Sequence, residues 1–546
     1  MLKSRVLDYL QTATYRELAL VVVGFWFVTS FLTKKGSPKV PGAPYHGYRS
    51  IFEPTLWLQL RFVTGGYNII ESGYNKLKNV PFVIRRYDTD ITVLPIKYLE
   101  EMRLVPRSKL SAKKAQINNL VPKWTWTAVM MNSDLHVHVL NAKLNPELSK
   151  YVEIAHTELD YGWDIDVPKP NTWTETDIQQ SMRMLVARMS AKIFMGDLAC
   201  RNEEWLNISI EFTYDLFKAA FTLRMFPPWM HLFVAPLIPA RWRIRRQMRV
   251  ARKIVGDITR KHLKDEKEGV KGQDTLLNWM IDHGTEQERS IPEMGARQCI
   301  MTLASIHTTS MSVSNLLFDL CTHPQWFPVL REEVDDVIKT HGALGESKLN
   351  AKQWLAKLEK MDSLIVECQR INPPILREFG APSSPRLCIP PPATILIIPR
   401  AVNPQRLSLV PITLKDGTHI PKGARIAWAG HHHANDPATL ADPELFDPMR
   451  SYRKRHADNG ANMNKYIAGQ TDSSTLSFGY GGQSCPGRYF AVAEIKMMLM
   501  RMLLEFEFKL PEGKERPKIM YADENVFMDP HATLMVRARK KTPSSA

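Results

Sequence analysis

The most informative segment of the chain lies near its C-terminal end and reads Phe478-Gly479-Tyr480-Gly481-Gly482-Gln483-Ser484-Cys485-Pro486-Gly487-Arg488. Glycines let a backbone pass close to a flat ligand where side chains would clash. An apolar run with helical character follows at once, from Tyr489 to Phe506. Because the N-terminal end of a helix carries a partial positive charge, a helix that begins just after Cys485 favours a thiolate. The segment therefore predicts a thiolate held by backbone N–H groups beside a flat group.

A thiolate of this kind is the axial ligand that an iron porphyrin needs, because it pushes electron density onto the iron and helps to cleave an O–O bond. The alternative is a glycine-rich turn around a buried structural cysteine. The segment resembles the haem-binding loop of the cytochrome P-450 family, F-x-x-G-x-x-x-C-x-G, with Phe478, Gly481, Cys485 and Gly487 in the matching places. The resemblance implies haem b as the cofactor and Cys485 as the ligand of its iron.

A second motif, Ala304-Ser305-Ile306-His307-Thr308-Thr309, lies inside a long apolar helical stretch. In the P-450 family a central helix crosses the haem face and carries A/G-G-x-D/E-T-T, so the resemblance implies that Thr308 guides protons during oxygen activation. This sequence departs from the pattern, since His307 replaces the acid and Ser305 replaces a glycine. A histidine can relay protons near neutral pH, so we expect His307 to assist Thr308. The alternatives are threonines bonded to their own helix and a satisfied core histidine.

Glu367 and Arg370 form an E-x-x-R pair on a helical stretch, where residues three apart face the same side. The segment Phe446-Asp447-Pro448-Met449-Arg450 follows later in the chain. The resemblance implies that Glu367, Arg370 and Arg450 form one buried ionic network under the haem, in which the loss of one member leaves a costly unpaired charge. Gln483 stands where relatives carry Arg or His near a haem propionate, so we expect a weaker hold on the haem.

The composition indicates a folded protein of a reducing compartment. Of the 546 residues, 44% are hydrophobic and 23% charged, and the six cysteines show no pairing pattern. Lys and Arg number 72 against 56 Asp and Glu, which gives a net charge of +16. No nucleic-acid motif accompanies this charge, so a membrane surface or an acidic redox partner is the better match. His431-His432-His433 is interpreted as structural, because three consecutive residues on a strand or loop cannot converge on one ion.

The N-terminal residues 1–35 are predicted to form a membrane anchor. Leu18 to Thr33 carry no charge, and Lys34-Lys35 follow them like a stop signal. The run is short for a bilayer span, and a signal peptide is the competing interpretation. Residues 36–50 are rich in proline and predict a stiff hinge, as membrane-bound members of the family have.

The remaining residues, 51–546, are predicted to form one catalytic domain of the P-450 fold, mainly helical with a small sheet. Helical periods cover Trp173–Met195, Glu203–Leu223, Arg241–Lys264, Pro292–Cys321 and Pro328–Thr340, and alternating runs lie near Phe82–Pro95 and Ile412–Trp428. The apolar patch Met225–Pro239 is too broken by proline to cross a membrane. It is either a core loop or a lip that dips into the bilayer. Residues 377–405 are rich in proline and longer than the family's usual crossing, so they are either a surface insertion or a retained intron.

The stretches Ala187-Arg188-Met189-Ser190, Asn202-Glu203-Glu204-Trp205 and Gly417-Thr418-His419-Ile420-Pro421-Lys422-Gly423 resemble the fungal ent-kaurene-oxidase-like branch of the P-450 family. This resemblance implies a haem-thiolate monooxygenase that oxidises a lipophilic, terpenoid-type secondary metabolite. Electrons are expected from NADPH through a separate reductase, with cytochrome b5 as a second donor, because the chain carries no flavin or nicotinamide motif. The expected location is the endoplasmic reticulum membrane, with a single span and the catalytic domain on the cytosolic side. Two alternatives stay open, namely a haem-thiolate isomerase or dehydratase without a reductase, and a non-catalytic haem-binding membrane protein.

Overall fold

Long helices make up most of the molecule. The computed structural model of the chain describes residues 36–372, 404–517, 520–522, 525–527, 529 and 531–540, together with residues 17, 20 and 24. The longer helices of this part are α3 (Thr55–Lys76), α9 (Leu148–Asp166), α10 (Ile178–Met195), α12 (Glu203–Arg224), α14 (Pro239–Lys267), α16 (Ile291–Thr322), α17 (Trp326–His341), α19 (Glu359–Ile371) and α22 (Arg488–Glu505). Shorter ones include α4 (Leu99–Met102), α5 (Ala112–Asn118), α6 (Pro122–Thr125), α7 (Val129–Asn132), α8 (Leu135–Val139), α11 (Asp197–Cys200), α13 (His231–Val234), α15 (Leu276–His283), α18 (Ala351–Leu355), α20 (Gly430–Ala434) and α21 (Arg450–His456).

The predicted helical ranges correspond to α10, α12, α14, α16 and α17, so the mainly helical prediction is confirmed. Side-chain caps explain several of the boundaries. The side chain of Asp177 accepts a hydrogen bond from the backbone of Gln180 at the start of α10, and Asn202 does the same for Trp205 at the start of α12. Residues 173–177, which the sequence assigned to the first helix, instead include the short strand β5 (Thr174–Thr176).

The strands form one larger sheet and smaller ones. The order in the six-stranded sheet is β1 (Tyr45–His46), β2 (Phe82–Arg85), β3 (Asp90–Val93), β9 (Arg425–Ala427), β6 (Gln405–Ser408) and β4 (Leu110–Ser111). The smaller sheets contain β10 (Phe506–Lys509) with β13 (Leu534–Ala538) and β5, β7 (Ile412–Thr413) with β8 (His419–Ile420), and β11 (Met520–Ala522) with β12 (Asn525–Phe527). The alternating runs predicted near residues 82–95 and 412–428 thus form strands.

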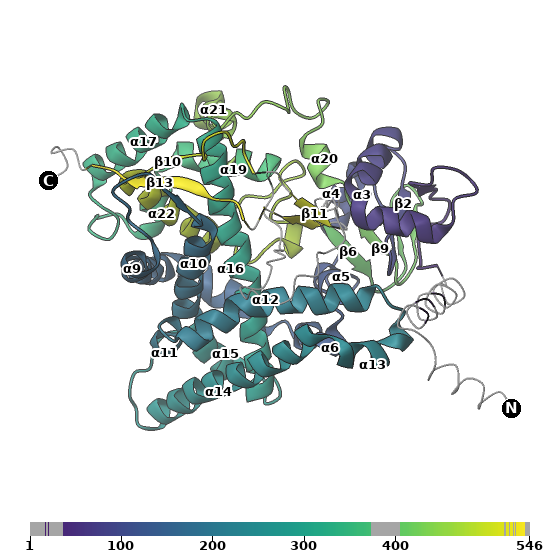
Figure 1. Cartoon of the computed structure of the whole chain (residues 1–546), viewed down its shortest axis with the longest axis horizontal. Helices are drawn as coiled ribbons and strands as arrows, with labels where there is room; N and C mark the ends of the chain where they lie inside the picture. The colour runs from purple at the N-terminus through teal and green to yellow at the C-terminus, as the bar shows by residue number, and fades with distance from the viewer. Residues whose placement is uncertain are drawn as a thin grey trace.

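Helix α16 runs through the helical part of the molecule, and the sheet with α3 lies to one side of it (Figure 1). Helices α10, α12, α14, α19 and α22 all contact α16, and α12 and α14 lie side by side against it. The helical part has one apolar core, which includes the fully buried side chains of Trp163 on α9, Trp205 on α12 and Trp354 on α18. Most side chains in the middle of α16 therefore lie deep inside the protein.

Four predictions from the sequence concern the membrane anchor, the hinge, the proline-rich segment and the histidine triad. Among the described residues no helix is long and apolar enough to cross a membrane, and the predicted anchor lies almost wholly outside them. The unusual segment 377–405 also lies outside them, except for Pro404 and for Gln405, which is the first residue of β6. Strand β1 falls inside the predicted hinge 36–50 and pairs with β2, so that part of the hinge is attached to the sheet. The histidine triad 431–433 lies on helix α20, which corrects the prediction of a strand or loop.

Candidate active site

The thiol of Cys485 lies in a loop that backbone hydrogen bonds fix in place. The N–H of Cys485 donates to the carbonyl oxygen of Phe478 at 2.7 Å, and a guanidinium nitrogen of Arg488 donates to the carbonyl oxygen of Cys485 at 2.9 Å. The cysteine is accessible, although protein surrounds the loop. Burial raises the pKa of the Cys485 thiol, while the N–H of Gly487 and the charge of Arg488 lower it. The helix end alone therefore does not secure the thiolate that the sequence predicted, and binding to a metal ion would have to displace the proton.

The glycines of the loop serve different purposes. Gly481 has a φ of +68°, and a Cβ atom there would lie 2.7 Å from the Cβ of Arg103, so its lack of a side chain is needed for a close approach to the protein itself. Gly482 and Gly487 border open space, because a Cβ at either position would meet no atom within 4 Å. An accessible thiol beside such open glycines fits the approach of a flat, iron-containing ligand.

The side-chain amide of Gln483 hydrogen-bonds the cysteine loop to strand β4 and the start of helix α5. Its oxygen accepts from the N–H of Ala112 at 2.7 Å, and its nitrogen donates to the carbonyl oxygen of Leu110 at 2.8 Å. Two cations that the sequence did not single out reach the same loop. Arg107 donates to the carbonyl oxygen of Gly482 at 2.6 Å, and Arg406 donates to that of Tyr480 at 3.3 Å.

Arg406 and Arg107 give the loop the positive charge that Gln483 does not. Arg406 is buried, and burial together with the charge of Arg107 lowers the pKa of its guanidinium to about 10, which leaves it charged at neutral pH. Two arginines at one loop are suited to the carboxylates of a porphyrin. No spacing motif connects residues 107 and 406 to the cysteine. Arg406 lies on β6, which pairs with β4, and Arg107 lies three residues before β4 begins.

One face of α16 opens in the middle of this otherwise buried helix. Ala304 is exposed and Thr308 is half-buried, whereas their neighbours Ile306 and His307 are buried. The hydroxyl of Thr308 donates to the carbonyl oxygen of Ala304 at 2.8 Å, so the oxygen atom keeps lone pairs with which it can accept a hydrogen bond. A small residue and a hydroxyl on an open face fit a helix that passes over a flat ligand.

His307 points away from this face and toward α12. Its Nε2 lies 3.2 Å from the carbonyl oxygen of Ile210, and its ring meets the edge of Tyr214 at a centroid distance of 5.1 Å. Burial, aided by the charge of Arg183, lowers the pKa of His307 to about 3. The structure therefore favours the satisfied core histidine over the proton relay, because a side chain that stays neutral and faces another helix is poorly placed to move protons.

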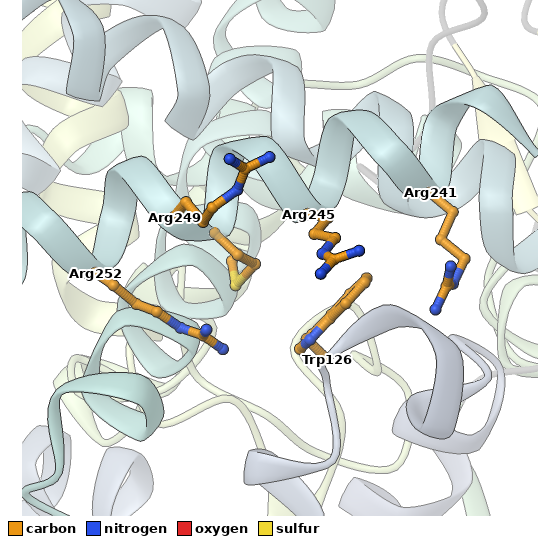
Figure 2. A pocket seen from close by; sticks show the side chains of 6 residues that line it. Trp126, Arg241, Arg245, Arg249 and Arg252 are labelled. Atoms are coloured by element: carbon orange, nitrogen blue, oxygen red, sulfur yellow. The ribbon is translucent and has the colours of Figure 1, made fainter. Parts of the chain in front are cut away.

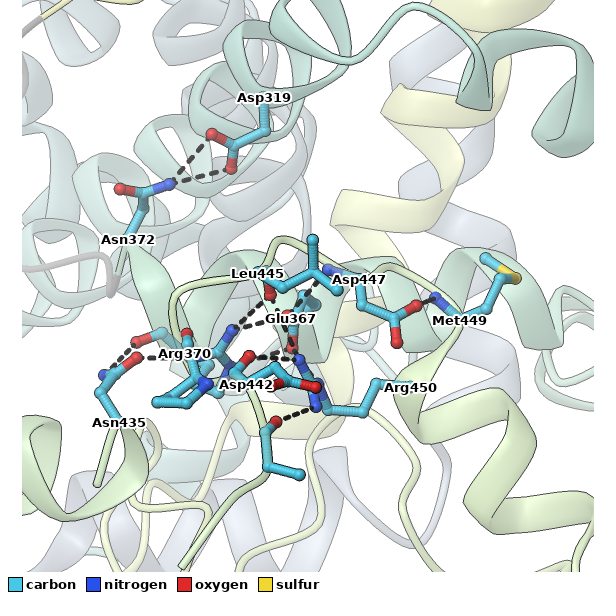
Figure 3. A network of polar contacts seen from close by, with 12 residues as sticks. Asp319, Glu367, Arg370, Asn372, Asn435, Asp442, Leu445, Asp447, Met449 and Arg450 are labelled. Atoms are coloured by element: carbon cyan, nitrogen blue, oxygen red, sulfur yellow. Dashed lines mark hydrogen bonds and ion pairs between the residues drawn. The ribbon is translucent and has the colours of Figure 1, made fainter. Parts of the chain in front are cut away.

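The structure brings Glu367, Arg370 and Arg450 together (Figure 3). Arg370 forms a two-bond pair with the carboxylate of Glu367, at 2.6 Å and 3.0 Å, and the Nε of Arg450 lies 3.6 Å from the same carboxylate. The two guanidinium groups also donate to carbonyl oxygens of the chain between Ala441 and Leu445. Glu367 is 2% exposed, so this is a buried carboxylate shared by two cations.

Replacing Glu367 with glutamine is expected to destabilise the protein by about 3–5 kcal/mol, because two partly buried guanidinium groups lose their buried counter-charge while the shape is kept. Chemical unfolding followed by circular dichroism measures this change. The matched control is Asp257→Asn, which breaks an exposed ion pair of the same spacing with Arg260 and should cost less than about 0.5 kcal/mol. Equal costs for the two variants would contradict the importance of the network.

Replacing His307 with glutamine is expected to leave the activity profile between about pH 6 and pH 8 unchanged, because His307 is already neutral there. The substitution should instead change how the free energy of unfolding depends on pH. The folded-state pKa lies below the ordinary value, so protons bind the unfolded chain preferentially and the wild type loses stability as the pH falls below about 6.5.

Between about pH 7.5 and pH 5 the stability of the glutamine variant relative to wild type should therefore rise by about 2 kcal/mol. Denaturant midpoints at the two pH values measure the difference. A gap between the two proteins that stays constant with pH would contradict the neutral, buried state of His307.

The chain is similar to known proteins over nearly its whole length. The family model described as Cytochrome P450 matches residues 100–379 and 397–536. A cytochrome P450 monooxygenase, ATR4, of Stachybotrys chlorohalonatus is 48% identical over 98% of this chain and 97% of its own length. An ent-kaurene oxidase of Fusarium fujikuroi is 36% identical over 98% of this chain and 95% of its own length.

A solved structure, retinoic-acid-bound cyanobacterial CYP120A1, shares the fold at a TM-score of 0.63, with 16% identity over 92% of this chain and 100% of that one. The resemblance that four short motifs indicated is thus confirmed along most of the sequence. On these grounds the chain belongs to the cytochrome P450 family of haem-thiolate monooxygenases.

Proposed function

We propose that this P450 oxidises a lipophilic, terpenoid-type secondary metabolite at the endoplasmic reticulum membrane, with O2 and with electrons from a separate NADPH-dependent reductase. Cytochrome b5 would be a second electron donor. The observation that carries the proposal is the accessible thiol of Cys485 in a loop fixed at Phe478 and Arg488. A fixed thiolate donor is what a haem iron needs for oxygen chemistry.

Residues of this chain would hold the haem from several sides. Cys485 would bind the iron, Gly482 and Gly487 leave space beside it, and Arg107 and Arg406 would pair with the propionates. When bound, the haem supplies the activation of O2 with two electrons and two protons. The Glu367 network lies in the segments that precede the loop and would keep their carbonyl groups paired.

Thr308 would position protons on the open face of α16. Its own hydrogen is engaged by the carbonyl oxygen of Ala304, so its oxygen can accept a hydrogen bond from a water molecule and hold that water in one orientation. The buried side chains on either side of Thr308 exclude other water from the helix. His307 takes no part in this proposal, because it bonds to α12.

The substrate class and the setting are supported by the relatives and by one exposed segment. A relative that covers 98% of this chain is named an ent-kaurene oxidase, and ent-kaurene is a terpenoid hydrocarbon. The segment Met225–Pro239 exposes Leu232, Phe233 and Leu237, with 64%, 66% and 79% of their surfaces accessible, which favours the membrane lip over the core loop. The predicted single-span anchor would bring this lip to the cytosolic face of the membrane.

The decisive experiment uses the full chain with a reductase, NADPH and candidate terpenoid hydrocarbons. Product should form only when all components are present, and Cys485→Ser should abolish both product and the thiolate-specific Soret band of the reduced carbon monoxide complex, because a hydroxyl is a poor ligand for this iron. Turnover that continues without the reductase would identify an isomerase or dehydratase instead. A Soret band that survives in the serine variant would show that another residue is the ligand.

Replacing Thr308 with alanine is expected to lower the yield of product per NADPH by about tenfold or more and to release hydrogen peroxide. The reason is that the water molecule that Thr308 would hold as a proton donor is no longer ordered. Peroxide and product are measured together in the reductase assay. Thr302→Ala is the matched control, since Thr302 is also bonded to its own helix, at 3.0 Å from the carbonyl oxygen of Gln298, but is fully buried. Similar uncoupling in both variants would count against a specific role for Thr308.

A further inference from the structure

A cavity rich in arginine lies away from the haem loop, between the first half of α14 and the residue that follows α6. Its volume is about 510 Å³, and its lining residues are Trp126, Arg241, Arg245, Met248, Arg249 and Arg252. Figure 2 shows Arg245 beside the ring of Trp126, with Arg241 and Arg252 on either side. The arginines recur at intervals of four, four and three residues, so they share one face of α14.

These four guanidinium groups lack counter-charges. Their side chains form no ion pair or hydrogen bond with the part of the chain that the structure describes, and the buried Nε atoms of Arg241 and Arg252 have no hydrogen-bond partner there. From Pro239 to Gly256 the helix carries seven arginines and lysines and no acidic residue. A buried donor without an acceptor costs free energy, so the cavity is suited to a ligand that brings anionic oxygen atoms.

Trp126 closes the cavity from the opposite side. It has a φ of +59°, in the left-handed region that bulky residues rarely adopt, and this conformation places its ring 5.3 Å from the guanidinium carbon of Arg241. Strain of this kind tends to persist where a binding site over-determines the backbone. The ring and the arginines together form a pocket with a positive wall and an aromatic wall.

The pocket adjoins the exposed apolar lip. Helix α14 begins at Pro239, the last residue of the lip, and Figure 1 shows α13 of the lip at the end of the layer that α12 and α14 form. Trp229 and Trp242 are exposed on either side of that junction. An apolar tip followed at once by unpaired arginines is the order in which a membrane-surface helix meets acyl chains and then phosphates.

We propose that this pocket binds the phosphate group of an anionic phospholipid while the lip contacts the acyl layer. Arginine is suited to this role because its planar fork donates two hydrogen bonds to phosphate oxygens. A free phosphate shares the chemistry of the head group but would not use the apolar lip. The proposal rests on the membrane setting proposed above and is independent of the reaction.

The test uses the full-length holoenzyme in phosphatidylcholine nanodiscs with a rising fraction of phosphatidylserine, followed by hydrogen–deuterium exchange in peptides that cover residues 118–128 and 239–256. Exchange in both regions should slow as phosphatidylserine rises. In the double variant Arg245→Gln, Arg252→Gln, the half-saturating fraction should rise by about tenfold or more. The control is Arg246→Gln, Lys253→Gln, which removes two exposed cations next in sequence that do not line the pocket.

The outcomes separate the source of the anion, the specificity of the pocket and the membrane setting. Protection by phosphatidylserine that millimolar inorganic phosphate does not reproduce supports the lipid head group, whereas equal protection by inorganic phosphate overturns it in favour of a free phosphate. Equal losses in the two double variants, or no protection at all, overturn the pocket as a specific site. Failure of the holoenzyme to co-elute with discs of phosphatidylcholine alone overturns the membrane setting instead, and the reductase assay in detergent tests the reaction separately.

Discussion

The buried carboxylate of Glu367 makes the ion pairs on which the order of residues 441–450 depends. It is buried on α19, it binds Arg370 from its own helix, and it attracts Arg450, which follows 83 positions later (450 − 367). The two guanidinium groups then bind carbonyl oxygens of residues 441–445, a stretch outside any helix or strand. Charge pairing on one helix thus takes the place of regular secondary structure in a neighbouring segment.

The sequence was sufficient to predict features whose information is local. The apolar period of residues 292–321 predicted α16 to within a residue at each end, and the three-residue spacing of Glu367 and Arg370 predicted that their side chains would meet. The sequence also predicted that the glycines of the motif allow a close approach of the backbone, but it did not predict which group comes close at Gly481. That glycine allows a close approach to Arg103, which lies far away in sequence.

The orientation of His307 could not be predicted, because it depends on a partner about a hundred residues away. The sequence does not say whether the side chain of His307 shares the open face of Thr308 or turns toward another helix. The contacts of His307 with Ile210 and Tyr214 on α12 show that it turns toward α12. The same limit applies to Arg406. Its approach to the cysteine loop follows from a strand pairing that no motif records. Contacts within one helix were therefore predictable from spacing, whereas the contact of Arg450 with Glu367 was foreseen only through the family resemblance, and the contacts of His307 and Arg406 were not foreseen.

The chain is held firmly on both sides of residues 373–403. The amide of Asn372 donates to both carboxylate oxygens of Asp319, each at 3.0 Å, and Gln405 opens a strand that pairs with β9. For a flexible connection between two fixed ends, the entropic cost of closing the loop grows slowly, by about 0.6 kcal/mol for each doubling of its length. The positions of α19 and β6 therefore depend on Asp319 and β9, and not on the length of the chain that joins them.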